Sequence, residues 1–178
     1  INKYIAHNPM HGIATPKGNV PAKQVITPEE FERMVVTIER TKHGMTMARD
    51  IALIHLLIDT GIRVSECGNI KYGDVDLDQR RILVTCGKGN KQRMVYFSGK
   101  TKERLEEYLK YRPKIKQGDW LIANLKQENG KMNKSGIESV IRKLGIASDI
   151  PRIHPHLFRA TFATNLIMRG TSPSVVQP

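Results

Sequence analysis

The first strong periodic signal in the chain is a helix that begins near residue 27. In TPEEFERMVVTIER, Thr27 suits the N-cap position, Pro28 suits the first turn, and Glu30 completes a capping box with Thr27. Residues 1–26 contain three prolines and no sustained hydrophobic period, which is typical of a linker. We therefore predict an interdomain linker over 1–26 and a folded domain over 27–178.

Hydrophobic positions further along the chain predict more helices and one β-hairpin. The segment TGIRVSECGNIKYGDVDLD predicts a turn and a short helix, with Ser65 as its cap. RILVTC and QRMVYF, joined by GKGNK, predict two antiparallel strands, and DWLIANL predicts a short extended stretch. Apolar residues at helical spacing lie at about 46–59, 100–112 and 135–144, and in HPHLFRATFATNL from residue 154. The predicted fold class is mainly α with a small antiparallel β-sheet (α+β).

The charge balance favours a polyanionic partner. Lys and Arg number 29 against 17 Asp and Glu, so the formal net charge is +12. Such an excess is most often matched to nucleic acid, and the alternative is a charge that serves only solubility. No run of ~18 apolar residues and no signal-peptide layout is present, so we expect no membrane association. Cys67 and Cys86 form no CxxC pair, which favours a reducing cytoplasm with both thiols buried and free.

Three separated places carry cations that packing does not require. Arg63 follows a turn glycine in TGIRVSE, and Lys88 is flanked by two glycines in CGKGNKQR. His156 and Arg159 are spaced i, i+3 in HPHLFR, so both project from one face of a helix. Brought together, these four side chains would make a phosphate clamp, in which the lysine or the histidine could also deliver a proton.

Each of these residues has a simpler interpretation when taken alone. Arg63 could be a surface or capping arginine, and Lys88 could be a solvated turn residue. His154 and His156 are separated by one residue, but no Cys, Asp or Glu set accompanies them at a metal-binding spacing. We therefore expect no metal, and the residues alone indicate a basic domain that binds phosphate.

Three ordered motifs, TGIRVSE, GKGNKQRMVYF and HPHLFRATFATNL, resemble the catalytic domain of the tyrosine recombinase (phage integrase) family, of the Xer-like, prophage or transposon type. The resemblance implies that Arg63 and Arg159 are the two active-site arginines and that His156 belongs to the same HxxR motif. It also implies that Lys88 is a general acid and that Glu66 is the acidic residue that accompanies the first arginine.

The resemblance further implies a reaction and its partners. In the family, a tyrosine hydroxyl attacks a phosphodiester of double-stranded DNA and forms a 3′-phosphotyrosyl link, with no metal or nucleotide cofactor. The complete protein would act as a homo-tetramer on DNA in a bacterial cytoplasm, and this chain alone would be a monomer. Candidate phosphate contacts, each with a solvated surface charge as the alternative, are Lys91, Arg93, Lys131 and Lys134.

The nucleophile of the family has no counterpart in this sequence. None of the five tyrosines lies in a matching context, and no LGH-like motif follows His156. Ser172 and Pro173 resemble a helix start that only a few residues follow, so we expect the catalytic domain to be incomplete at its C-terminus. Such a chain should bind DNA without forming a covalent adduct. The alternatives are a non-catalytic DNA-binding remnant of a recombinase and a type IB topoisomerase-like enzyme.

Overall fold

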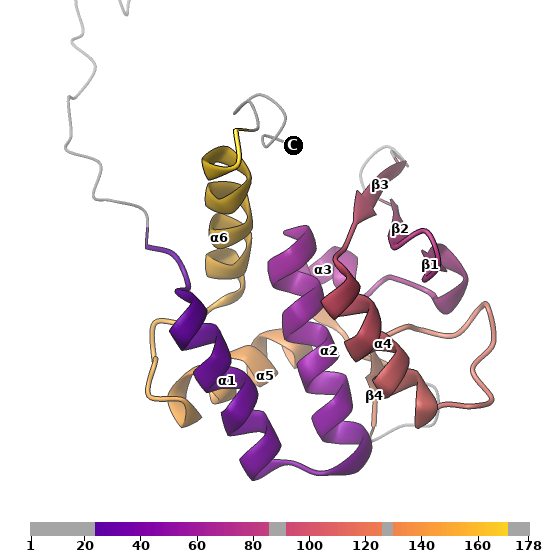
Figure 1. Cartoon of the computed structure of the whole chain (residues 1–178). Helices are drawn as coiled ribbons and strands as arrows, with labels where there is room; N and C mark the ends of the chain where they lie inside the picture. The colour runs from indigo at the N-terminus through magenta and orange to yellow at the C-terminus, as the bar shows by residue number, and fades with distance from the viewer. Residues whose placement is uncertain (1–23, 86–91, 126–129, 171–178) are drawn as a thin grey trace, which may run out of the picture.

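A computed structural model describes residues 24–85, 92–125 and 130–170. The described part is mainly helical, with two small antiparallel sheets (Figure 1), and this confirms the predicted fold class. The elements in chain order are α1 (Pro28–Thr41), α2 (Gly44–Thr60), α3 (Val64–Cys67), a 3-10 turn η1 (Tyr72–Asp74), β1 (Val75–Asp76), β2 (Arg81–Thr85), β3 (Gln92–Tyr96), α4 (Gly99–Lys110), β4 (Ala123–Asn124), β5 (Gly130–Lys131), α5 (Lys134–Ala147) and α6 (Pro155–Met168).

Helix α2 is the centre of the core. Every residue over 48–57 is buried, so this helix has no solvent-facing stripe in its middle turns. Helices surround it because a helix buried on all faces needs a partner on each side. It packs against α1, α4 and α6, and Figure 1 shows α1 and α4 on opposite sides of it. Among the described residues, no helix is both long enough and apolar enough to cross a membrane.

The predicted start of α1 is confirmed in detail. Thr27 Oγ1 accepts from the Glu30 N–H at 3.2 Å, and Glu30 Oε2 accepts from the Thr27 N–H at 3.0 Å. One residue earlier, Ile26 is buried in the core, and its N–H donates to Thr161 Oγ1 of α6 at 2.8 Å. The capping box therefore fixes the direction of α1, while Ile26 ties the chain before it to the last helix.

The predicted hairpin is also confirmed, and its register decides which side chains face inward. Strands β1, β2 and β3 form one antiparallel sheet in that order, with Val84 opposite Arg93. Ile82 and Val84 on β2 are buried, so the face of β3 that carries Arg93 lies toward the interior. The alternate residues of β3 face solvent, and Tyr96 is 65% exposed.

One local prediction was wrong, and another is confirmed. Ser65 does not cap the short helix, because Arg63 is the N-cap of α3 and Ser65 lies inside the helix. The extended stretch near Trp120 forms a bridge with Lys71 and then strand β4, which pairs with β5. The predicted division of the chain at residue 27 stays a prediction.

One carboxylate, that of Asp50, is completely buried within the helical core. Asp50 of α2 is 0% exposed and forms ion pairs with Lys42 and with Arg49, whose Nη2 lies 2.7 Å from Asp50 Oδ1. The Arg49 side chain is itself buried and also donates to the Ala123 carbonyl at 3.3 Å. This triad of Lys42, Arg49 and Asp50 thus joins α2 to β4. The charges of Arg49 and Asp50 are buried, so each of them must be paired with an opposite charge.

We expect Asp50→Asn to lower the free energy of unfolding by about 3–5 kcal/mol, because it leaves the buried Arg49 without its counter-ion. Urea denaturation of the purified chain measures this change. The control is Asp78→Asn, which removes a carboxylate that is 94% exposed and 3.4 Å from Lys102 Nζ. The control variant should unfold at the wild-type midpoint, and an equal loss in both variants would contradict the role given to burial.

A second prediction concerns pH. Burial is the main cause that lowers the pKa of His55 to about 4, and the charges of Arg104 and Lys100 contribute to the lowering. The unfolded chain takes up this proton near its ordinary pKa of 6.5, so stability should fall as the pH drops from 6.5 toward 4, by up to roughly 3 kcal/mol. His55→Gln should flatten this dependence between pH 7.5 and pH 4.5 in urea denaturation, and an unchanged slope would contradict it.

Candidate active site

The candidate site begins at the turn between α2 and α3. Gly61 caps α2 in the left-handed conformation, with φ of 60°, and Arg63 follows as the extended N-cap of α3. Helix α2 therefore ends directly before Arg63, whose side chain is 48% exposed. Figure 1 shows α3 beside the C-terminal end of α2.

Glu66 is the buried anchor of this site. Its Oε2 accepts from the Arg63 N–H at 2.8 Å, and its Oε1 accepts from Arg63 Nη1 at 3.1 Å. Arg93 of β3 donates to the same carboxylate, from Nη1 at 3.0 Å and from Nη2 at 2.8 Å. Burial raises the pKa of Glu66, but the hydrogen bonds and charges of Arg93 and Arg63 outweigh it and lower that pKa to about 2. The carboxylate is therefore ionised at neutral pH.

The next residue, Cys67, is a free thiol and 1% exposed. Burial raises the pKa of Cys67 to about 12, and the neighbouring Glu66 carboxylate contributes to the rise. The prediction of a buried free thiol is confirmed for Cys67, and Cys86 lies outside the described residues.

Arg159 meets this turn from α6. Its Nη1 donates to the Gly61 carbonyl at 2.7 Å, so two arginines that are 96 positions apart lie around one turn. Burial lowers the pKa of Arg159, and the positive charge of Arg63 contributes to the lowering. Arginine stays protonated in proteins, so the turn is lined by fixed positive charge.

His156 lies one helical turn before Arg159 and is exposed. Its ring centroid is 6.5 Å from that of His154, whose Nδ1 lies 2.7 Å from the Arg152 carbonyl oxygen. The described residues contain no group of three or more His, Cys, Asp or Glu side chains that could hold a metal ion. His156 is thus accessible and close in sequence and helical position to Arg159.

The other predicted site residues fall into two groups. Lys88 and Lys91 lie outside the described residues, although the strands on either side of them are in place. Lys131 donates to Asn69 and lies over the Trp120 ring, with its Nζ 4.9 Å from the ring centroid. Lys134 Nζ lies 3.7 Å from Glu138 Oε1 within α5. These two lysines therefore have partners outside the cluster of Arg63, Glu66, Arg93 and Arg159.

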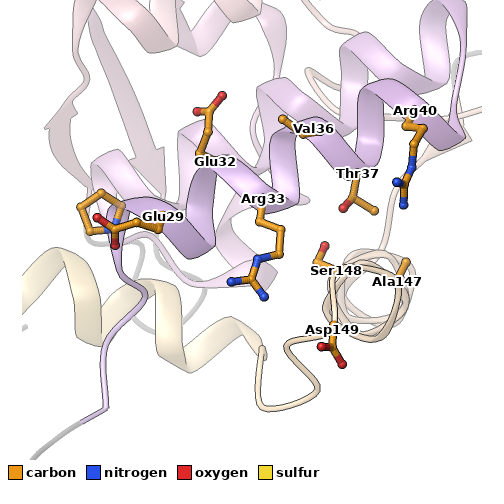
Figure 2. A pocket seen from close by; sticks show the side chains of 10 residues that line it. Glu29, Glu32, Arg33, Val36, Thr37, Arg40, Ala147, Ser148 and Asp149 are labelled. Atoms are coloured by element: carbon orange, nitrogen blue, oxygen red, sulfur yellow. The ribbon is translucent and has the colours of Figure 1, made fainter.

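An open groove lies elsewhere, between α1 and the end of α5. Figure 2 shows Arg33, Thr37 and Arg40 of α1 directed toward Ala147 and Ser148. The Ser148 hydroxyl is buried and has no hydrogen-bond partner among the described residues. Glu29, Glu32 and Asp149 line the same groove, so its charge is mixed, and none of the predicted site residues that the structure describes lines it.

The sequence placed Arg93 among candidate DNA contacts or solvated charges, and it indicated Gly61 only as a turn glycine. A signal for Arg93 was available, because the alternation of the hairpin puts Arg93 on the same face as Val95, and an inward charge needs a counter-ion. The role of Gly61 depends on Phe162 and Arg159 of α6, and no local pattern indicates which helix packs against the turn.

The fold and this polar cluster define a class, the catalytic domains of tyrosine recombinases. The crystal structure of XerA recombinase superposes with a TM-score of 0.74 and 30% identity, covering 86% of this chain and 54% of that one. XerH recombinase bound to its difH substrate gives a TM-score of 0.70 and 25% identity, over 86% of this chain and 45% of that one. More specifically, the chain belongs to the phage integrase family, whose profile matches residues 24–178.

Relatives within the family agree with this assignment and confirm the predicted resemblance. The tyrosine recombinase XerC of Staphylococcus epidermidis is 36% identical over 174 residues, which are 96% of this chain and 57% of the relative. XerC of Listeria welshimeri is 32% identical over 179 residues, with 97% and 58% covered. The chain thus spans somewhat more than half the length of the curated relatives it matches.

We expect Gly61→Ala to destabilise the domain by about 2 kcal/mol or more, for two independent reasons. The left-handed φ of 60° strains any other residue, and an added Cβ would lie 2.3 Å from Phe162 Cδ1. Gly118→Ala is the matched control, because no heavy atom lies within 4 Å of a Cβ at that position. Thermal unfolding of both variants checks this, and a wild-type melting temperature for Gly61→Ala would contradict it.

Proposed function

We propose that this chain is the catalytic domain of a site-specific DNA recombinase that cleaves and rejoins strands through a 3′-phosphotyrosyl intermediate. The observation that carries the proposal is the convergence of Arg63 and Arg159 at the Gly61 turn. With Arg93 and the Glu66 carboxylate added, the cluster contains three guanidinium groups and one carboxylate, so its net charge is +2. Such a cluster attracts an anion with several oxygens, as a DNA phosphate has.

The residue types suit phosphoryl transfer. Negative charge gathers on the non-bridging oxygens as the nucleophile attacks phosphorus, and Arg63 and Arg159 are the groups proposed to neutralise it. His156 is proposed to hydrogen-bond the same phosphate from the solvent side of α6. Lys88 is proposed to protonate the departing 5′-oxygen, and a 5′-hydroxyl from another strand then displaces the tyrosine. The phosphodiester energy is conserved in the covalent link, so this reaction needs no nucleotide cofactor.

The nucleophilic tyrosine is proposed to be none of the four tyrosines that the structure describes. Tyr108 is fully buried, and its hydroxyl accepts from the Ala123 N–H at 3.2 Å. Tyr96 is on the face of β3 opposite to Arg93. Tyr72 lies in η1 and Tyr111 directly after α4, and neither of these segments contains a residue of the cluster. The nucleophile is therefore proposed to come from outside the described residues.

The partner is proposed to be double-stranded DNA, in a bacterial cytoplasm. The high net charge of +12 and the relation to XerC recombinases of bacteria support this. The XerH structure contains its difH substrate. A homo-tetramer on DNA, with a monomeric chain in its absence, follows from the family resemblance and remains part of the proposal, as do contacts to phosphate by Lys91, Lys131 and Lys134.

In the full-length protein, Arg63→Ala and Arg159→Ala should each lower the rate of strand cleavage by about 10²- to 10³-fold, because each removes one preorganised donor to the transition state. The measurement is the trapping of a covalent protein–DNA adduct on a nicked suicide substrate, followed in single turnover. DNA affinity should change little, since most phosphate contacts remain.

Arg40→Ala is the control, because Arg40 is an exposed arginine on α1 that lines the separate groove. It should cleave at the wild-type rate. Cleavage near the wild-type rate by Arg63→Ala or Arg159→Ala would remove that arginine from the site. Failure of the full-length wild-type protein to form any adduct, on DNA that it binds, would favour a DNA-binding function without chemistry.

A further inference from the structure

Arg93 occupies an unusual position for a charged residue on a β-strand. It lies on the inner face of β3, opposite the buried Val84, and its side chain is only 33% exposed. An arginine directed inward from a sheet costs free energy unless a counter-ion meets it. The counter-ion here is Glu66, which belongs to a different element, α3.

The contact between the two residues is bidentate. Arg93 Nη1 lies 3.0 Å from Glu66 Oε1, and Arg93 Nη2 lies 2.8 Å from Glu66 Oε2. Two parallel hydrogen bonds fix the plane of the carboxylate as well as its position. Glu66 in turn accepts from both the N–H and the Nη1 of Arg63, so the orientation of one carboxylate sets that of the Arg63 side chain.

The same contacts argue against direct phosphate binding by Arg93. Its two terminal nitrogens form the edge with which arginine binds phosphate, and both of them are bonded to Glu66. Arg63 donates to the carboxylate from its side chain through Nη1 and is the more exposed of the two arginines, with 48% against 33% of the side chain accessible. Arg63 is therefore the group presented to a ligand, and Arg93 stands behind it.

We propose that Arg93 is a positioning residue, which orients Glu66 and through it holds Arg63 in the geometry that binds the scissile phosphate. This inference rests on the proposed function. The buried Glu66 keeps its charge largely through Arg93, whose hydrogen bonds and charge lower the pKa of that carboxyl. Without Arg93 the pKa of Glu66 rises, and a protonated Glu66 accepts less well from Arg63.

The test uses the full-length protein and single-turnover cleavage of a suicide substrate between pH 5 and pH 8. Arg93→Gln should lower the rate by roughly 10-fold at pH 7, and the loss should grow as the pH falls because Glu66 then becomes protonated. Arg93→Lys should restore part of the rate, since it keeps the charge but not the paired hydrogen bonds. A pH profile parallel to that of the wild type would overturn the proposal.

A double-mutant cycle separates action through Glu66 from direct contact. In a Glu66→Gln background, adding Arg93→Gln should change the rate less than about 2-fold, because the route through the carboxylate is already lost. The salt dependence of DNA binding should keep its slope. Additive losses in the cycle, or a slope smaller by ~0.9, would show a direct phosphate contact and overturn the proposal.

Arg81→Gln is the matched control. Arg81 is also a sheet arginine paired with a carboxylate, Asp76, at 3.0 Å, but it is exposed on the outer strand face. It should cleave at the wild-type rate with a wild-type pH profile. If the wild-type protein forms no adduct, the proposed function fails. If the wild type forms the adduct and Arg93→Gln matches it in rate and pH profile, only the role of Arg93 fails.

Discussion

The Gly61 carbonyl accepts a hydrogen bond from Arg159 at the same turn where any side chain on residue 61 would collide with Phe162. Two helices that are distant in sequence, α2 and α6, thereby meet with almost no space between them. The turn also directs the chain into Arg63, the first residue of the candidate clamp. Close packing and the placement of charge thus have one common origin, and the rest of the site is arranged around it.

Charge around this turn is balanced in a particular way. Three arginines in proximity repel one another, and burial adds to the cost for Arg159, as the direction of its pKa shift shows. The Glu66 carboxylate offsets part of that repulsion from the buried side of the cluster, where it is inaccessible to solvent and to a bulky ligand. A single buried carboxylate therefore allows the cluster to remain cationic on its outer side. This arrangement differs from the triad at Asp50, in which two cations enclose one carboxylate and serve the core.

Local patterns in the sequence predicted the elements whose causes are local. The capping box at Thr27 and the strand alternation around the hairpin are contained within a few residues, and both are confirmed. Ser65 was wrong as a cap because α3 begins directly after the Gly61 turn, so its N-cap is Arg63, two residues before Ser65. The partners of Arg93 and Arg159 depend on contacts between distant elements, which no local pattern indicates. Only the family resemblance nominated Glu66, whereas the positions of Arg63 and Arg159 in their motifs already indicated part of a phosphate clamp. Lys88 was nominated in the same way and lies outside the described residues.

The burial of Cys67 limits how fast its thiol can react. A thiol that is 1% exposed, with a pKa of about 12, has almost no reactive thiolate at neutral pH while α3 stays in place. Its modification by a thiol reagent must therefore wait for a local opening of the segment that also contains Glu66. The rate of that modification therefore measures how often this segment opens and the Glu66 carboxylate separates from Arg63 and Arg93.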